Sequence, residues 1–406
     1  MTLPVVVLGR DGVLHLRNGH PWIYPGHLAT RGPPHTGLVA LEGPAGRPRG
    51  VAVWNPASRI PLRVVARGAE TAADPVWEGD GWWQARLDAA VAARAASLAF
   101  GEQACRWVHS ESDGLPGLVV DRYADVAVLQ AGCAWADAVA PAIARRLVER
   151  HGVRGVLARH DGGFRKPEGL PEGVAELAGS VPHEVRWESS GVVRVADPWT
   201  GQKTGAYLDQ RENQAWAARA LPVGRALDAF SNDGGFALHL ARAGSRVLCL
   251  DGSETALAGL RRNAELNGLS VGEPDSDAAL QPAKTNVFEA LRALVESGER
   301  FDAVVLDPPA LAKRKAQIPE ALRGYRELNL RALKLLRQGG RLLTCSCSYQ
   351  LHEQHFLEVL AEAASDAGVD VRVVERRGAA ACHPRRLAFP ESAYLKAALL
   401  EVTGTW

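Results

Sequence analysis

Two cysteines one residue apart, Cys345 and Cys347, stand at the end of "RLLTCSCS", an apolar stretch with the pattern of a buried strand. The spacing is a weak metal signal, because His352 is the only further ligand type close by, and a redox pair would be C-x-x-C. Burial in the core is an ordinary role for cysteine. We assign that role to Cys345 and predict that Cys347, nearer the carboxyl end of the strand, faces a cleft. No metal site is predicted.

A carboxylate stands at the end of another predicted strand, in "VVLDPPALAK". Asp307 is followed by Pro308 and Pro309, which fix a rigid turn without backbone donors and direct a carboxylate and backbone carbonyls into a cleft. Enzymes that methylate exocyclic amino groups usually place an aromatic residue after such prolines, where it stacks on the base. Here Ala310 follows, which argues against amino-group chemistry.

A cysteine and a carboxylate at neighbouring strand ends suit methylation of a pyrimidine carbon. Carbon 5 of cytosine is a poor nucleophile, but attack of a thiolate on carbon 6 makes it enamine-like, so that it takes a methyl group from a sulfonium. We predict Cys347 as the nucleophile and Asp307 as the group that protonates or hydrogen-bonds ring nitrogen 3. A base must then remove the carbon-5 proton. Two alternatives stay open: an RNA amino-group methyltransferase in which Cys347 is dispensable, and a non-catalytic RNA-binding factor of ribosome assembly.

The stretch "LDAFSNDGGF" combines a predicted strand, a turn at Gly234 and Gly235, and a helix start. About twenty residues later a second strand ends in Asp251, where a carboxylate commonly accepts hydrogen bonds from ribose hydroxyls. The pattern is not the dinucleotide fingerprint G-x-G-x-x-G, so it favours S-adenosylmethionine over NAD. A third strand is predicted in "KTNVF", residues 284–288, with its end beside the adenine. The cofactor-binding residues predicted from these strand ends are Asp228, Phe230, Ser231, Asn232, Gly234, Gly235, Asp251, Gly252, Ser253, Asn286, Val287 and Asp307.

An alternation of predicted strands and helices from about residue 215 positions these side chains. It indicates a parallel, doubly wound, Rossmann-like sheet, in which ligands bind outside the carboxyl ends of the strands. Residues 1–70 instead show short β-rich runs, among them "GVLHL" at 12–16, typical of a small β-barrel. Between them an α+β pattern predicts a helix over 82–99 and a hairpin over 114–132. The fold class is multidomain α/β, with domains at 1–72, 73–185 and 186–406, the last beginning with a hairpin.

The composition fits a globular protein with a polyanion partner. Of 406 residues, 47% are hydrophobic and 23% charged, as in ordinary globular proteins. We predict no membrane segment, since the early apolar run "LPVVVL" is far too short to span a bilayer, and six scattered cysteines favour the cytoplasm. Residues 1–68 hold eight arginines against two acidic residues, a net charge of +6, which suggests nucleic acid. Arg10 and Arg17 are predicted RNA contacts in this module.

Several motifs together resemble those of the 23S rRNA 5-methylcytosine methyltransferases with an N-terminal PUA domain. The resemblance implies a PUA-like RNA-binding domain, a central α+β domain and a class I methyltransferase domain with S-adenosylmethionine as the methyl donor. It also implies 23S rRNA or a large-subunit assembly intermediate as the partner, and homodimers are common in the family. The family's cysteine matches Cys347 in Ser346-Cys347-Ser348. The motifs are "HPWIY" (20–24), "GLPGLVVDRY" (114–123), "GQKTGAYLDQREN" (201–213), "LDAFSNDGGF", "LDPPALAK" and "TCSCS".

The segment "GQKTGAYLDQREN" is the most specific of these motifs. We interpret it as a flap over cofactor and base, in which Gln210 and Arg211 approach the methionine carboxylate or the RNA backbone. Lys203 in this segment and Lys313 in "LDPPALAK" are further predicted RNA contacts. The chain departs from the family at "FSNDGG", where Tyr-Thr more often precedes the glycines, and at Asn286, where many methyltransferases have Asp.

Overall fold

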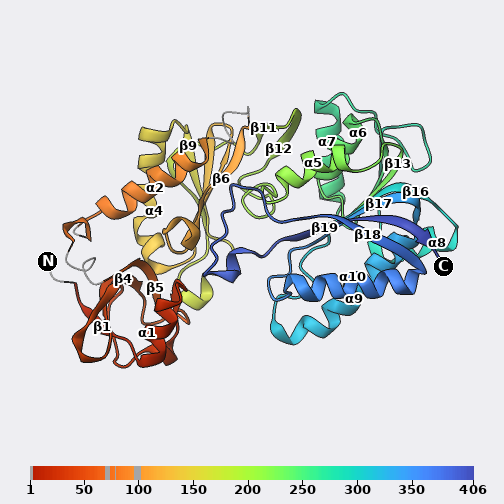
Figure 1. Cartoon of the computed structure of the whole chain (residues 1–406). Coiled ribbons are helices and arrows are strands. Elements are labelled where there is room, and N and C mark those ends of the chain that lie inside the picture. Colours follow the sequence, from red (N-terminus) through yellow and green to blue (C-terminus); the bar gives the residue numbers. More distant parts are fainter. Residues whose placement is uncertain (1–2, 69–73, 78, 96–101) are drawn as a thin grey trace. The chain divides into compact units, whose positions relative to one another are not determined.

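The computed structural model describes residues 3–68, 74–77, 79–95 and 102–406. Two compact units share the chain (Figure 1). Unit 1 comprises residues 1–189, 196–208 and 382–392, and unit 2 comprises residues 190–195, 209–381 and 393–406.

The first sheet of unit 1 has the strand order β1-β3-β4-β5-β2. β1 pairs parallel with β3, and the other neighbours are antiparallel. Its inner face buries Ile23, Leu41, Trp54 and Leu62. The strands are β1 (Val5–Val7), β2 (Trp22–Ile23), β3 (Gly37–Glu42), β4 (Pro48–Trp54) and β5 (Leu62–Arg67).

One predicted strand in this part is wrong, because "GVLHL" lies within the helix α1 (Arg10–Arg17). Gly12 and Leu16, four residues apart, are its buried residues, which is the spacing of one helix face. A five-residue run fits this period and the strand period almost equally well. A side chain at Gly12 would place its Cβ 2.3 Å from the carbonyl oxygen of His27, so glycine permits the close approach.

The second sheet of unit 1 has the order β10-β9-β8-β7-β6. The predicted hairpin over 114–132 is confirmed as β7 and β8, and the helix α4 (Ala134–His151) connects β8 to its parallel neighbour β9. The predicted helix over 82–99 is α2 (Gly81–Ala93), and residues 96–99 lie outside the described residues. The strands of this sheet are β6 (Ala104–His109), β7 (Leu118–Tyr123), β8 (Val126–Ala131), β9 (Gly155–Arg159) and β10 (Val174–Gly179), and β11 (Val185–Ser189) does not belong to it.

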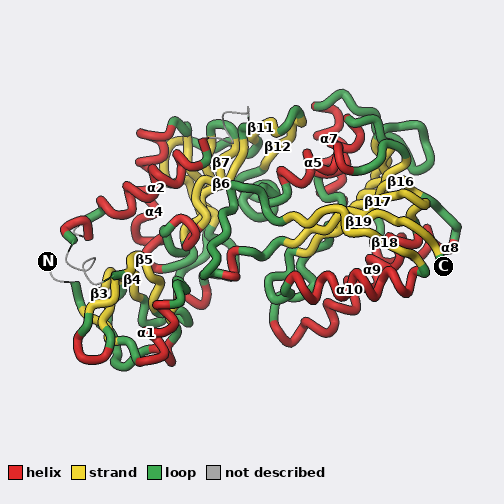
Figure 2. The backbone as a smooth tube through the Cα atoms, in the orientation of Figure 1, coloured by secondary structure: helices red, strands yellow, loops and turns green. Residues whose placement is uncertain are grey.

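Unit 2 contains a seven-stranded sheet of order β15-β14-β13-β16-β17-β19-β18, drawn in yellow between red helices in Figure 2. The first five strands are parallel, while β19 runs antiparallel to both neighbours. The doubly wound prediction is therefore confirmed. The strands of unit 2 are β12 (Val192–Ala196, of which Ala196 belongs to unit 1), β13 (Arg225–Ala229), β14 (Arg246–Asp251), β15 (Leu280–Lys284), β16 (Phe301–Leu306), β17 (Leu336–Ser346), β18 (Val369–Arg377) and β19 (Lys396–Thr405).

Helices cover both faces of this sheet (Figure 1). One core lies between the sheet and α5 (Arg211–Ala220), α6 (Gly235–Arg242) and α7 (Glu254–Leu266). The other core lies between the sheet and a second group of helices, where Tyr325 and Phe356 are fully buried. That group is α8 (Val287–Glu296), α9 (Ile318–Lys334) and α10 (Glu353–Ala367).

The third strand of unit 2 lies earlier in the chain than predicted. β15 is Leu280–Lys284, not 284–288, and it contains Pro282. Proline cannot donate to a neighbouring strand and is tolerated in edge strands. Because β15 is the edge strand of this sheet, with β14 as its neighbouring strand, the proline does not interrupt the sheet.

Short 3₁₀ helices connect several elements. They are η1 (Pro25–His27), η2 (Pro44–Gly46), η4 (Pro75–Trp77), η5 (Ser110–Asp113), η6 (Lys166–Glu168), η7 (Lys315–Gln317) and η8 (Pro390–Ser392).

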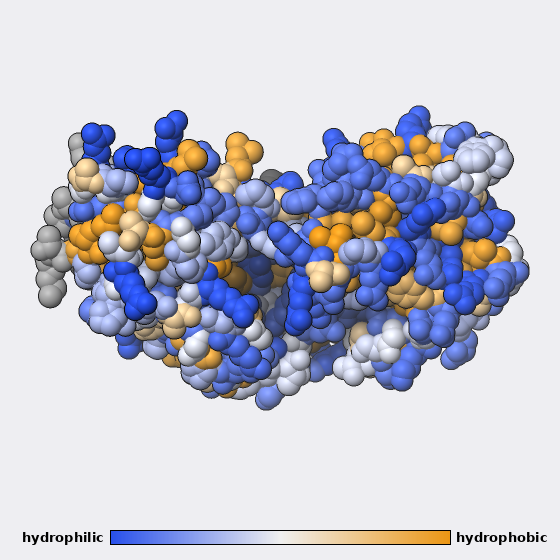
Figure 3. All heavy atoms as spheres, turned by 90° about the horizontal axis from the view of Figure 1, so that it is seen from below, coloured by the Kyte–Doolittle hydropathy of each residue, from blue (hydrophilic) through white to orange (hydrophobic). Residues whose placement is uncertain are grey.

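Hydrophilic residues cover most of the face drawn in Figure 3, and hydrophobic residues appear there in smaller patches. Within the described part of the chain, every helix is too short or too polar to cross a lipid bilayer.

Candidate active site

Most of the predicted catalytic and cofactor residues lie at one edge of the seven-stranded sheet. Phe230 follows β13, Asp251 ends β14, Asp307 follows β16 and Cys347 follows β17. The register aligns these ends, since Ala229 pairs with both Leu250 and Leu306, and Leu306 pairs with Thr344. Carboxyl ends of parallel strands form the usual ligand-binding edge of such a sheet.

The two cysteines differ in exposure. Cys345 is 0% exposed and belongs to the core beneath α5–α7, and burial raises the pKa of its thiol well above the usual value. Cys347 lies just past the end of β17 and is partly exposed, whereas the other five cysteines are buried. Its Sγ atom is 3.8 Å from the carbonyl oxygen of Pro308. Of the two, Cys347 is the thiol that a substrate can reach.

The turn after β16 brings Asp307 and Pro308 beside the end of β17. The amide of Asp307 donates to the carbonyl of Ala229 at 3.4 Å, and its side chain is half-buried. The charge of Asp307 adds to burial in raising the pKa of both Asp228 and Cys345. The Asp307 carboxylate is thus close both to Asp228, a predicted cofactor-binding residue, and to the strand that carries the two cysteines.

Hydroxyl groups hold the cysteine loop against the turn after β16. The Tyr325 hydroxyl lies 3.0 Å from Ser346 Oγ and 2.9 Å from Ser348 Oγ. Ser348 Oγ accepts a hydrogen bond from the amide of Ala312 at 3.1 Å. The serines on both sides of Cys347 therefore anchor its loop to α9 and to "LDPPALAK". Sequence reasoning missed Tyr325, although it lies on the buried face of α9.

Asp228 is a buried carboxylate with one oxygen left without a partner. Its Oδ2 accepts from the amide of Ala237 at 2.9 Å, and its Oδ1 has no hydrogen-bond partner among the described residues. Burial, together with the charges of Asp307, Asp251 and Asp233, raises the pKa of Asp228 to about 8. An orphaned buried oxygen at a ligand-binding edge fits an acceptor for a polar ligand group.

The glycine turn after β13 is strained and tied to β14. Phe230, Asn232 and Gly234 have φ values of 67°, 47° and 88°, and left-handed non-glycine residues concentrate at functional sites. The amide of Asn232 donates to Asp251 Oδ2 at 2.9 Å, and the amide of Ser253 donates to Oδ1 at 2.8 Å. The Asp251 carboxylate therefore fixes the turn as well as the start of α7.

Gly235 begins α6 where a side chain has no room. Its Cβ would lie 2.3 Å from Nε2 of Gln214. The helix start consequently approaches the neighbouring α5 closely.

Asn286 serves as the N-cap of α8. Its side-chain oxygen accepts from the amide of Phe288 at 3.0 Å. The rings of Phe230 and Phe288 meet edge to face with centroids 6.3 Å apart, and Val287 is buried. The residues predicted to lie beside the adenine are thus the N-cap and the first residues of α8, rather than the end of a strand.

The segment "GQKTGAYLDQREN" is divided between the units, with residues 201–208 in unit 1 and 209–213 in unit 2. In unit 2, the side-chain oxygen of Gln210 accepts from Asn213 at 2.7 Å, and Asp209 accepts from the Tyr394 hydroxyl at 2.8 Å. Arg211 is buried at the start of α5 and lies 3.4 Å from Glu212. The Gln210 side chain also partly opposes the rise in the pKa of Cys345, which places it next to the cysteine strand.

The predicted RNA contacts are exposed and lie in both units. Arg10 and Arg17 are at the two ends of α1 in unit 1. Lys203, also in unit 1, places its ammonium 4.4 Å from the Tyr207 ring centroid. Lys313 lies in unit 2, after the Asp-Pro-Pro turn.

Lys396 is a further residue that sequence reasoning missed. Its Nζ donates to the carbonyl of Ser348 at 2.7 Å and to that of Tyr394 at 2.8 Å. It comes from β19, a strand that the sequence analysis did not identify, and no local motif marks it.

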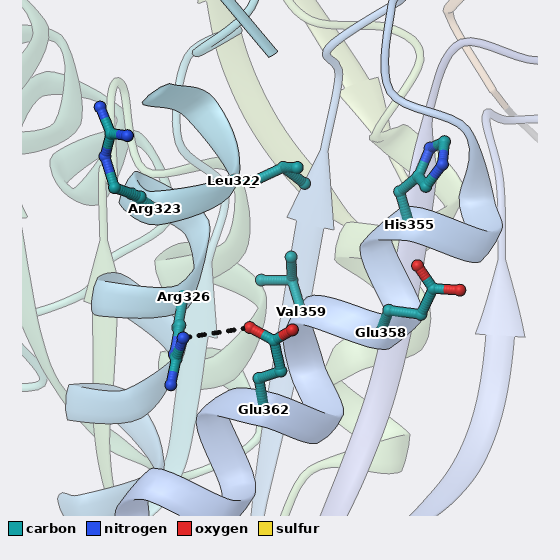
Figure 4. Close-up of a pocket in the computed structure, with 7 residues that line it drawn as sticks. All are labelled: Leu322, Arg323, Arg326, His355, Glu358, Val359 and Glu362. Atoms are coloured by element: carbon teal, nitrogen blue, oxygen red, sulfur yellow. Dashed lines mark ion pairs between the residues drawn. The ribbon is translucent and has the colours of Figure 1, made fainter. Parts of the chain in front are cut away.

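A small pocket between α9 and α10 lies apart from these strand ends (Figure 4). Arg326 forms ion pairs there with Glu362 at 3.2 Å and with Asp366 at 2.6 Å. The volume of this pocket, about 150 Å³, is below the roughly 300–1,000 Å³ of small-molecule sites. It is lined by Leu322, Arg323, Arg326, His355, Glu358, Val359 and Glu362.

Two family models match the chain. One, described as an S-adenosylmethionine-dependent methyltransferase, matches residues 171–400, and the other, a PUA-like domain, matches residues 6–67. Relatives from Shewanella amazonensis and Aeromonas salmonicida, both named ribosomal RNA large subunit methyltransferase I, are 37% identical over 399 and 396 residues. These alignments cover 97% and 96% of this chain, and 98% and 97% of the relatives.

Solved structures show the same fold at low sequence identity. A methyltransferase crystallised in complex with SAH is similar with a TM-score of 0.81 and 16% identity, covering 98% of this chain and 100% of that chain. An S-adenosylmethionine-dependent methyltransferase from Streptococcus mutans is similar with a TM-score of 0.78 at 16% identity and the same coverage.

Proposed function

The chain belongs to the S-adenosylmethionine-dependent methyltransferase family, and from that premise we propose that it methylates carbon 5 of a cytidine in 23S rRNA through a covalent adduct with Cys347. The observation that carries the proposal is the contrast at the end of β17. Cys345 is sealed in the core, whereas Cys347 is partly exposed beside the Asp-Pro-Pro turn. An amino-group methyltransferase does not require such a thiol.

The substrate follows from the relatives and from the basic N-terminal module. The relatives carry the name ribosomal RNA large subunit methyltransferase I, and residues 6–67 match a PUA-like domain. The exposed Arg10 and Arg17 on α1 suit phosphate contacts, which position RNA without reading its sequence. A target base inside a helix must be extruded before a thiol can reach it.

The described residues fit S-adenosylmethionine. Asp228 offers a buried oxygen that has no partner among the described residues, the turn at residues 230–234 has the left-handed backbone that is common at functional sites, and Asp251 follows the glycine turn at the spacing of a ribose acceptor. Gln210 and Arg211 lie at the start of α5. The bound cofactor supplies an electrophilic methyl group. The residues proposed to hold it are Gln210, Arg211, Asp228, Phe230, Ser231, Asn232, Gly234, Gly235, Asp251, Gly252, Ser253, Asn286, Val287 and Asp307.

In the proposed reaction the Cys347 thiolate forms a bond to carbon 6 of cytosine, and the displaced electron pair moves onto the ring. Asp307, which takes up a proton from water when the substrate binds, donates this proton or a hydrogen bond to ring nitrogen 3, where negative charge develops. Carbon 5 then takes the methyl group and loses its proton to a base. Elimination breaks the bond to Cys347 and returns the proton of ring nitrogen 3 to Asp307, which restores both the aromatic ring and the thiolate.

Methyl transfer with matched cysteine variants tests the proposal. Wild type, Cys347→Ala and Cys345→Ala are incubated with labelled S-adenosylmethionine and protein-free large-subunit rRNA, and the nucleosides are analysed. We expect 5-methylcytidine with wild type and Cys345→Ala, and a loss of at least about 10⁴-fold with Cys347→Ala. A methylated amino group, or full activity without Cys347, would refute the covalent mechanism. If naked rRNA gives no product, the same comparison is made on large-subunit assembly intermediates.

A further inference from the structure

Lys396 is a buried lysine at the base of the cysteine loop. It lies opposite Ser346 in the antiparallel pairing of β17 with β19 and is 6% exposed. Its ammonium donates to the carbonyls of Ser348 and Tyr394. Ser348 is the residue directly after Cys347, so this charge is held at the loop that carries the thiol. Lysine is almost never this buried without a charged partner.

Among the described residues, no carboxylate forms an ion pair with Lys396. Within the described residues, no acidic oxygen lies within 4.0 Å of Nζ. Burial lowers the pKa of Lys396 to about 8, and the charges of Cys347 and Glu353 partly oppose this effect. Two neutral carbonyl acceptors leave a buried ammonium in need of an anion. The adjoining Cys347 can provide that anion as a thiolate.

We propose that Lys396 is a positioning residue for Cys347, whose buried ammonium stabilises the thiolate and thereby activates the nucleophile. This inference rests on the proposed function. The thiol proton leaves to water before the substrate binds, and the ammonium stays protonated throughout. The thiolate forms its bond to carbon 6 and, on elimination, returns to its place beside the same ammonium.

The other groups around Cys347 oppose its ionisation. The Pro308 carbonyl at 3.8 Å accepts from the protonated thiol, and the Asp307 carboxylate repels a neighbouring negative charge. Tyr325, whose pKa is raised by burial, remains neutral. Without a cation, the thiol would stay protonated at neutral pH, since the ordinary cysteine pKa is about 8.5. The titratable groups around Cys347 and Lys396 are Asp209, Asp307, Tyr325, Cys345, Glu353 and Lys396 itself.

Alkylation of Cys347 measures this coupling without RNA or cofactor. Full-length wild type, Lys396→Gln, Lys396→Met and Lys396→Arg are treated with iodoacetamide between pH 6 and 10, and modification of the Cys347 peptide is followed by mass spectrometry. The glutamine variant keeps an N–H donor and removes the charge. Lys334→Met, at an exposed position of α9, is the matched control. Thermal melting verifies that each variant is folded.

We expect the pH midpoint of alkylation to rise by about one unit in Lys396→Gln and Lys396→Met, with roughly tenfold slower modification near pH 7. We expect the pH midpoint in Lys396→Arg to lie close to that of wild type, and the midpoint in Lys334→Met to equal it. Equal midpoints in wild type and Lys396→Gln would overturn the inference.

The assay separates this inference from the proposed function. If wild type makes 5-methylcytidine but the midpoint is insensitive to Lys396, only the role of Lys396 fails. If the midpoint shifts while wild type makes a different product, the thiolate pairing holds and the cytosine chemistry fails. If both hold, the pH profile of methyl transfer in Lys396→Gln moves upward together with its alkylation midpoint.

Discussion

Arg63 in unit 1 and Asp228 in unit 2 are both buried ionisable residues, but their surroundings differ. Arg63 donates to Glu111 at 2.6 Å and to Glu168 at 3.0 Å. Burial would raise the pKa of Glu111, yet the charge of Arg63 keeps it below the usual value. Asp228 has a single backbone donor, an unpartnered oxygen and a pKa raised to about 8.

This difference in partners distinguishes buried groups that stabilise the fold from buried groups that are available to bind a ligand. Among the described residues of unit 1, the buried arginine, aspartate and glutamate side chains each form an ion pair. Through Glu111 and Glu168, Arg63 of β5 contacts the predicted 73–185 domain. At the strand ends of unit 2, Asp228 and Lys396 are buried, and neither forms an ion pair with a described carboxylate or basic group. Buried groups with strongly shifted pKa values cluster at functional sites. We therefore expect substitution of Arg63 to lower the stability of the protein, and substitution of Asp228 to raise it as the pH increases.

Arg63→Met should give the largest loss of stability. It leaves Glu111 and Glu168 buried without their cation, which costs about 3–5 kcal/mol. We expect this loss in urea unfolding, with unchanged S-adenosylmethionine affinity in the folded protein. Arg59→Met, at an exposed position of the same module, should change stability by less than about 0.5 kcal/mol. Equal effects of the two variants would remove the distinction between the networks.

Asp228→Asn should act on pH dependence and not on folding itself. The unfolded carboxyl ionises near pH 3.9 and the folded one near pH 8, so between these values the folded protein holds an extra proton. Stability therefore falls as pH rises through this window, by up to about 1.4 kcal/mol per unit. The asparagine variant should lose this slope, so that between pH 5 and 8 it gains about 2–4 kcal/mol relative to wild type. Urea unfolding of wild type and Asp228→Asn at pH 5 and pH 8 measures this difference in stability. If the stability of both proteins changed equally with pH, Asp228 would already be ionised in the folded wild type.

Tyr325→Phe removes the hydroxyl that contacts Ser346 and Ser348. Buried hydrogen bonds of this kind are worth about 1–2 kcal/mol, and we expect a loss of that size in unfolding free energy. Because this hydroxyl holds the cysteine loop, methyl transfer should decline more than stability alone explains. Tyr349→Phe, on an exposed ring, is the control and should leave stability within about 0.5 kcal/mol. If Tyr325→Phe and Tyr349→Phe had the same stability and the same methyl-transfer activity, Ser346 and Ser348 would hold the cysteine loop without Tyr325.

Local rules predicted part of this arrangement. The doubly wound sheet and the different burial of Cys345 and Cys347 follow from strand alternation and from the strand-end rule, which need only neighbouring residues. The contact of Lys396 with the cysteine loop could not be predicted from local sequence, because it depends on the pairing of β17 with β19, about fifty residues later in the chain. The third strand was predicted to begin only at Lys284, after Pro282, since a proline is tolerated in β15 only because β15 is an edge strand. Non-local pairing therefore limited the prediction in both cases.

Asn286 gives the smallest expected effect and tests whether a departure from the family is structural. Its side chain caps α8 through the amide of Phe288, so Asn286→Ala should cost about 1 kcal/mol of stability. Asn286→Asp keeps the cap and introduces the residue that many methyltransferases have there. If Asn286 only caps, both variants bind S-adenosylmethionine as wild type does, as measured by calorimetry. A loss of affinity in Asn286→Ala that is absent in Asn286→Asp would instead place the Asn286 amide oxygen in contact with the cofactor, because loss of a cap alone lowers stability without removing a ligand contact.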